Sequence, residues 1–193
     1  GLLQAQLYLF EGLGVDAQGD MGYLQAHLAN NQTPSSLVTA WSLAGVIRLY
    51  LGAGAAAREL QLRGGWGSYQ FRLEGVPFPG VALEGPYGGL HMILPVGTHV
   101  LALILGADYR FGVKASGDTL QLGQPRGGWG VAAQAGARLT FGSWELTGTY
   151  GWEQYNVPFT GPTSLAQTAA QWSDVKLVDT AQGFRVMLGK HYD

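Results

Sequence analysis

The chain has 193 residues, with 31 Gly, no Cys and a net charge of −2. That length fits one domain or at most two, and the charge offers no basic surface for nucleic acid. A hydrophobic content of 47% excludes a disordered chain, and the lack of Cys excludes a disulfide scaffold. Only 12% of residues are charged, about half the usual share for a soluble domain. No apolar run approaches the length of a transmembrane helix.

Apolar and polar residues alternate with a period of two along most of the chain, which predicts β-strands. We expect eight strands, each with one apolar face. In chain order they cover residues 3–9, 41–53, 58–74, 81–94, 98–114, 121–143, 144–153 and 184–189.

Gly142 and Ser143 separate two of these runs and predict a two-residue hairpin turn, with Gly at the position of positive φ. Phe141 then pairs directly with Trp144. This register predicts that Arg138 lies diagonal to Glu145 on the polar face.

The pair Gly64 and Gly65 interrupts the alternation within residues 58–74. Leu62 is at an even position before the pair, whereas Tyr69 is at an odd position after it. Because a bulge moves the following side chains to the other face, we expect a β-bulge here. The bulge would place Tyr69 on the apolar face and Arg72 on the charged face.

Short turns are expected at one end of the sheet, near residues 54–57, 95–97 and 142–143. Longer polar connections are expected at the other end, over residues 16–37, 76–80, 114–126 and 157–182. This asymmetry is typical of outer-membrane barrels, which have tight periplasmic turns and longer extracellular loops.

The face opposite the apolar one carries most of the charged residues, together with small residues such as Ala44 and Gly136. A crowded eight-stranded interior needs such small residues. Because unpaired buried charges are costly, we expect a packed network of ion pairs rather than an open pore. The candidate interior charges are Arg48, Glu59, Arg63, Arg72, Glu74, Asp108, Arg110, Arg138, Glu145, Glu153 and Arg185.

Aromatic residues stand at both ends of the apolar face, as in the two aromatic girdles of membrane barrels. The candidate girdle residues are Trp41, Tyr69, Tyr109, Phe111, Trp129, Phe141, Trp144, Tyr150 and Trp152. Parity alone also fits a soluble ligand-binding barrel with the charges outside. The small residues and the aromatic positions favour the membrane barrel.

The final run, GFRVMLGKHYD, alternates apolar residues up to the near-terminal Tyr192. It resembles the C-terminal insertion signal of small eight-stranded outer-membrane barrels of the OmpA/OmpX type, and the whole chain resembles that family. It departs from the signal in Lys190, on the apolar parity, and in Asp193, after the aromatic residue.

The resemblance implies an all-β fold class, an eight-stranded antiparallel transmembrane β-barrel, as a single domain over residues 1–193. It also implies a place in the bacterial outer membrane, contact with outer-membrane lipid or lipopolysaccharide, and no cofactor.

His27, His91, His99 and His191 are the candidates for a general base. Their surroundings lack the His-x-Ser spacing of the outer-membrane lipid A deacylases, so we expect no enzyme. His91 and His99 are expected to flank the turn near residues 95–97.

Asp16 and Asp20 offer oxygens to a divalent cation, but their spacing lacks an EF-hand pattern, so a solvated loop is the favoured interpretation. The Gly-rich stretches 64–67 and 127–130 are not followed by Lys and Ser or Thr, and we expect close strand contacts there rather than phosphate binding.

The segment from Ser164 to Asp179 is the most distinctive connection. It is expected to pack over the barrel mouth, with partner binding by an exposed strand edge as the alternative. The sequence therefore predicts envelope support or surface interaction through the loops. The alternatives are a narrow channel for small or hydrophobic solutes, marked by conductance or a lateral gap between strands, and a lipid-modifying enzyme.

Overall fold

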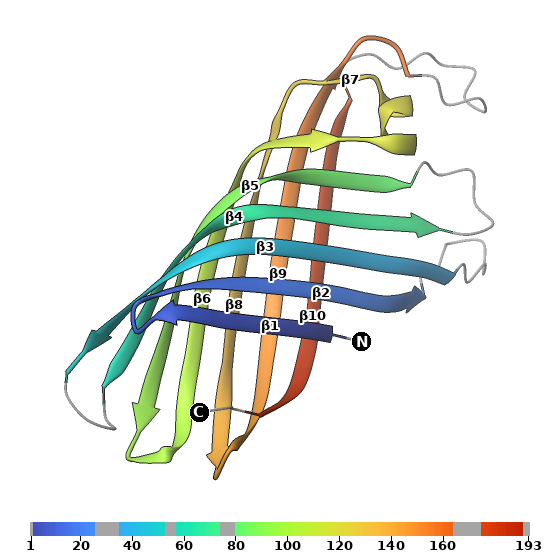
Figure 1. The fold of residues 1–193 in the computed structure, drawn as a ribbon. Helices are drawn as coiled ribbons and strands as arrows, with labels where there is room; N and C mark the ends of the chain where they lie inside the picture. Colours follow the sequence, from blue (N-terminus) through green and yellow to red (C-terminus); the bar gives the residue numbers. More distant parts are fainter. Residues whose placement is uncertain (1, 26–34, 53–56, 74–79, 164–174, 191–193) are drawn as a thin grey trace.

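The computed structural model describes residues 2–25, 35–52, 57–73, 80–163 and 175–190. It is all-β, a single strongly curved antiparallel sheet of ten strands (Figure 1). The strands are β1 (Leu2–Phe10), β2 (Leu13–Gln25), β3 (Ser35–Leu51), β4 (Arg58–Leu73), β5 (Val81–Val96), β6 (Thr98–Ala115), β7 (Gln124–Pro125), β8 (Gly128–Phe141), β9 (Trp144–Thr160) and β10 (Lys176–Lys190). One 3₁₀ helix, η2 (Gly117–Leu122), follows β6. No helix in the described residues is long and apolar enough to cross a membrane.

Nine strands form one continuous path, β1-β2-β3-β4-β5-β6-β8-β9-β10, and the short β7 pairs with β9 beside it. The prediction of a closed barrel of eight strands is therefore wrong, because the path through the described residues has nine strands and does not close. Among the described residues no backbone pairing joins β1 to β10. Because neighbours alternate in direction along an odd number of strands, β1 and β10 run the same way. Their direct closure would require a parallel pair rather than the antiparallel pairs found elsewhere.

The additional long strand is β2, in a region where the sequence predicted a loop over residues 16–37. Residues 16–25 belong to β2 and 35–37 to β3, while 26–34 lie outside the described residues. Val15 and Met21 are exposed on one face of β2, whereas Asp16 is buried on the other. The alternation was present, but Gly and Asp within it are depleted in strands and led to the loop interpretation.

The predicted hairpin at Gly142 and Ser143 is confirmed. Phe141 pairs with Trp144, and Gly142 has a φ of 62°. The bulge expected at Gly64 and Gly65 is wrong, because β4 keeps an uninterrupted register with β3 through both residues.

A bulge instead interrupts β6. The register with β8 shifts between Phe111 and Val113, and the intervening Gly112 has a φ of 59°. The shift turns Val113 into the interior, where it is fully buried.

The concave face of the sheet can be identified from side chains that touch across an intervening strand. Arg63 of β4 contacts Asp16 of β2 across β3, and Arg110 of β6 contacts Glu153 of β9 across β8. Side chains converge on the inside of a curved sheet, and Asp16 is buried here, so this face is the interior of the molecule.

The outer, convex face carries a belt of exposed large apolar side chains that includes all nine strands of the path. We call it the apolar belt. Its residues are Leu3, Leu7, Leu9, Leu13, Val15, Met21, Trp41, Leu43, Ile47, Leu49, Leu51, Leu62, Trp66, Leu90, Val96, Leu103, Leu105, Tyr109, Phe111, Trp129, Leu139, Phe141, Trp144, Leu146, Tyr150, Phe184, Val186 and Leu188.

The interior at the end of the long connections holds a compact apolar cluster. It contains Tyr69, Val81, Leu83, Val113, Ala115, Leu122, Tyr155, Val157 and Phe159. Helix η2 covers this cluster through Leu122. Its Thr119 hydroxyl donates to Gly80 O at 2.8 Å and accepts from the Ala82 amide at 2.7 Å, which ties the helix to β5.

Candidate functional site

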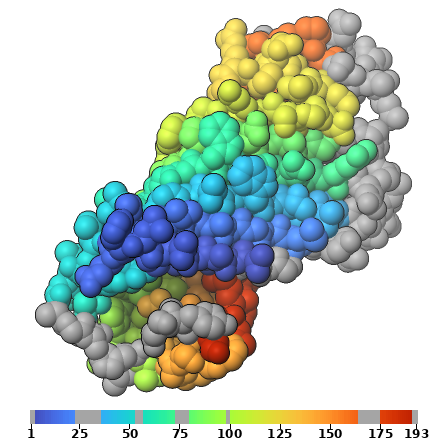
Figure 2. All heavy atoms as spheres, in the orientation of Figure 1, coloured from blue at the N-terminus to red at the C-terminus, as the bar shows by residue number. Residues whose placement is uncertain are grey.

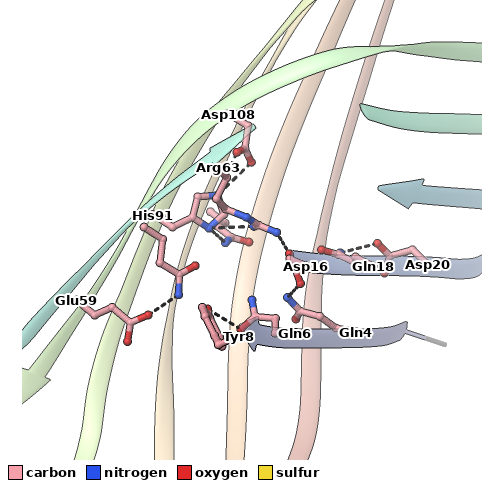
Figure 3. Close-up of polar contacts among 12 residues, drawn as sticks. Gln4, Gln6, Tyr8, Asp16, Gln18, Asp20, Glu59, Arg63, His91 and Asp108 are labelled. Atoms are coloured by element: carbon pink, nitrogen blue, oxygen red, sulfur yellow. Dashed lines mark hydrogen bonds and ion pairs between the residues drawn. The ribbon is translucent and has the colours of Figure 1, made fainter. Parts of the chain in front are cut away.

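The polar interior of the sheet is the candidate site, and its centre is a buried ion pair between Asp16 and Arg63 (Figure 3). Asp16 is 1% exposed and also accepts a hydrogen bond from Gln4 Nε2 at 3.0 Å. The Arg63 side chain is 8% exposed. A charge pair this deeply buried is costly to desolvate, so each partner depends on the other.

His91 of β5 extends this network. Its Nε2 lies 3.1 Å from Asp108 Oδ1, while its Nδ1 lies 3.0 Å from Gln134 Nε2 and 3.4 Å from Arg63 Nη1. Because both donors point to Nδ1, the network assigns the ring hydrogen to Nε2, which donates to Asp108. The sequence analysis expected His91 to flank the turn near residues 95–97. In the structure His91 lies within β5 and is buried in the interior.

A second cluster surrounds Arg48 near the short turns. Arg48 Nε lies 2.8 Å from Glu59 Oε1, and Nη1 donates to the Tyr50 hydroxyl at 2.7 Å. The guanidinium also lies 3.4 Å from the centre of the Tyr8 ring. Tyr8 belongs to β1, so this contact helps to hold the edge strand on the sheet.

A third cluster lies towards the long connections. Arg110 Nε and Nη2 each lie 2.8 Å from Glu153 Oε1, which also accepts from the Tyr155 hydroxyl at 2.7 Å. The rings of Tyr69 and Tyr155 stack at 5.5 Å. The cluster therefore joins β4, β6 and β9 through the interior.

An ion pair joins Arg185 on β10, the last strand of the path, to Asp20 on β2, the second strand. Arg185 Nη2 lies 3.4 Å from Asp20 Oδ2. Near the short turns, Arg138 Nη1 lies 3.7 Å from Glu145 Oε2, as the hairpin register predicted.

The interior also contains a cavity of about 580 Å³, a volume typical of small-molecule sites. Its walls include Arg63, His91, Arg110 and Glu153, and it reaches Arg185 on β10. Ion pairs thus fill the interior only in part.

Within the described ranges the outer edges of β1 and β10 have no backbone partner, and they leave a seam in the wall of the sheet. Gln6 of β1 and Arg185 of β10 lie on the inward parity of these edge strands, yet both are exposed. On the central strand β3, by contrast, Ala44 and Val46 are buried. Figure 2 shows a hollow between β1, in blue, and the orange and red strands β9 and β10.

Most predicted interior charges do face the interior, where each pairs with an opposite charge or, in the case of Asp108, with the ring of His91. These are Arg48, Glu59, Arg63, Asp108, Arg110, Arg138, Glu145, Glu153 and Arg185. Arg72 is the correction: without a bulge at Gly64 and Gly65 it stays on the outward parity and is exposed. Glu74 lies outside the described residues.

Seven predicted girdle residues are exposed on the outer face. They are Trp41, Tyr109, Phe111, Trp129, Phe141, Trp144 and Tyr150. Trp152 has the same outward parity and is partly buried. Tyr69 is the correction, since the uninterrupted register of β4 turns it inward to stack on Tyr155.

Sequence reasoning missed Asp16 and Asp20 as interior residues, and it did not single out His91 or Gln134 as partners of the interior charges. Parity within residues 13–21 would have identified the two aspartates. In the part of the chain that the structure describes, no group of three or more His, Cys, Asp or Glu is placed to hold a metal ion. The two aspartates considered as cation ligands each pair with an arginine instead.

His27, His191 and Tyr192 lie outside the described residues, as does most of the segment from Ser164 to Asp179. The end of that segment forms the beginning of β10. Comparison with family models, curated proteins and solved structures found no match to this chain.

Proposed function

We propose that this chain is an integral protein of the bacterial outer membrane, and that its sheet forms a barrel-like wall with lipid on the outside. The apolar belt carries the proposal. Soluble monomers rarely expose apolar patches beyond a few hundred Å², whereas here every strand of the path contributes exposed apolar side chains to the outer face. The charged residues of the same strands pair with one another inside.

The height of the apolar belt agrees with this placement. On β3 it extends from Leu51 to Trp41, ten residue steps along the strand, or about 33 Å. At a strand tilt of about 40° this distance spans about 25 Å, the height of the apolar band in outer-membrane barrels. Beyond Trp41 polar side chains enter the outward positions, with Thr39 on β3, Gln70 on β4 and Lys114 on β6, although Leu37 on β3 and Val178 on β10 are also exposed there.

The role that we propose is non-enzymatic, with the wall as an anchor for envelope support or for surface interaction through the long connections. The partners would be outer-membrane lipid or lipopolysaccharide, and a surface protein bound through the segment from Ser164 to Asp179. The apolar cluster under η2 supports an anchor rather than a water-filled pore, because it fills the interior at that end.

A second candidate function is the binding or passage of hydrophobic solutes. The observation that favours it is the seam between β1 and β10 together with the interior cavity. Such a gap in the wall is the feature that a route for hydrophobic solutes requires.

Electrophoresis without prior boiling tests the membrane proposal. We expect the detergent-folded chain to migrate differently before and after boiling, and to precipitate when detergent is removed. A monodisperse monomer in plain buffer would contradict the proposal. The side chains of the apolar belt would then have to be shielded from water by something other than lipid.

A further inference from the structure

The cavity and the seam meet at β10. Cavity walls include Met21 on β2 and Phe184, Arg185 and Val186 on β10. Among the described residues the outer edge of β10 has no backbone partner, so the cavity is bordered by a free strand edge on that side.

The polarity of the side chains changes from the inner to the outer side of this edge of the cavity. On its inner side lie the paired charges of the polar interior. On its outer side Phe184 and Val186 are 70% and 61% exposed, more than most side chains of the apolar belt. A ligand that fits both sides has a polar head and an apolar tail.

Arg185 is the cavity cation most accessible to such a head group. Its side chain is 42% exposed, and its ion pair with Asp20 is long, at 3.4 Å. Arg63 and Arg110 are 8% and 18% exposed and are held by Asp16 and Glu153. An arriving anion therefore meets Arg185 first.

Asp20 does not depend on Arg185 alone. Its Oδ2 also accepts a hydrogen bond from Gln18 Nε2 at 2.9 Å. Asp20 thus keeps a donor when Arg185 turns to another anion, which lowers the cost of exchanging the carboxylate for a ligand head group.

We propose that the seam binds an amphiphile with one anionic head group and an alkyl chain. The head group, a carboxylate or a phosphate, pairs with Arg185 at the mouth of the cavity. The chain lies along Phe184, Val186 and Met21 towards the apolar belt. This inference rests on the proposed membrane placement and adds a ligand class to it.

The test is equilibrium binding of radiolabelled dodecanoate and dodecyl phosphate to the full chain in phosphatidylcholine nanodiscs. Empty nanodiscs measure partition into the lipid, and dodecanol serves as the neutral-head probe. We expect saturable binding of an anionic probe, about tenfold tighter than dodecanol, the effect of one charge-assisted hydrogen bond. The tighter of the two anionic probes identifies the head group as carboxylate or phosphate.

Two substitutions are expected to change the affinity for the anionic probes in opposite directions. Arg185→Gln should weaken anion binding about tenfold and leave dodecanol binding unchanged. Asp20→Asn should tighten anion binding roughly threefold, because it removes a competing carboxylate. Arg72→Gln, which removes an exposed arginine from the outer face, should change neither.

A heat-modifiable band for each variant establishes folding before binding is measured. If the chain folds in the nanodisc but binds anionic and neutral probes equally, or if Arg185→Gln and Asp20→Asn shift binding in the same direction, the ligand assignment is wrong and the membrane placement stands. If the chain stays soluble without lipid, the membrane placement itself fails.

Discussion

Asp16 on β2 and Arg63 on β4 form a buried ion pair across the intervening strand β3. The two residues are 47 positions apart in the sequence, and they meet on the concave face of the curved sheet. The pair connects to Gln4 on the edge strand and to His91 on β5. The ion pair and these two neighbours therefore connect four strands, β1, β2, β4 and β5.

Removal of one partner should therefore be costly. Arg63→Met leaves the Asp16 carboxylate buried without its cation, and we expect a loss of about 3 kcal/mol in the free energy of unfolding. The double variant Asp16→Asn with Arg63→Met should lose clearly less than the sum of the two single variants. Urea unfolding from phosphatidylcholine vesicles measures all three. Additive losses would show that the two side chains do not interact.

A charged substitution on the outer face should destabilise the folded protein strongly only within the apolar belt. Leu103→Arg places a cation among belt residues, and we expect it to cost about 2–4 kcal/mol of folding free energy in vesicles. Gln70→Arg, on the outward parity of β4 beside Thr39 and beyond Trp41, should cost less than about 1 kcal/mol. Equal costs at the two positions would remove the basis for placing the belt in lipid.

The tight approach of β8 to β9 should exclude a side chain at Gly136. A Cβ at Gly136 would collide with Gly148 O and lie 2.7 Å from the Thr149 Cα atom, whereas a Cβ at Gly183 meets nothing within 4 Å. We expect Gly136→Ala to destabilise the sheet by about 1–3 kcal/mol. Gly183→Ala is the matched control and should be nearly neutral. The midpoint of urea unfolding reports both, and tolerance of Gly136→Ala would contradict the close packing.

The apolar cluster should prevent ion flow. Val113 and Val157 are fully buried and Phe159 is 1% exposed, all in the interior at the end of the long connections. We expect no stepwise conductance from the wild-type chain in planar bilayers. Steps of uniform size, abolished by boiling the sample first, would favour the narrow channel instead.

Much of the fold was predictable because parity directly reports the two faces of a strand. It identified the charged face and the hairpin that brings Arg138 to Glu145. It failed where composition or a glycine pair outweighed the alternation. Asp16 and Gly19 made β2 look like a loop, and Gly64 with Gly65 suggested a bulge that β4 lacks.

Other features have no local signal in the sequence. The stacking of Tyr69 on Tyr155 depends on how two distant strands are brought together, and so does the ion pair of Arg185 with Asp20. The seam depends on the number of strands and on whether the first and last run in the same direction. Neither the number of strands nor the relative direction of the first and last strands is known until every strand has been assigned. One missed strand changes both.

The central claim is that the apolar belt faces lipid, and spin labels on β9 test it most directly. The chain has no Cys, so single substitutions to Cys at Leu146, Thr147, Thr149 and Tyr150 each give one defined label. In phosphatidylcholine vesicles we predict high oxygen and low nickel-chelate accessibility at Leu146 and Tyr150, and low oxygen accessibility at Thr147 and Thr149. Higher nickel-chelate than oxygen accessibility at Leu146 and Tyr150 would contradict the account.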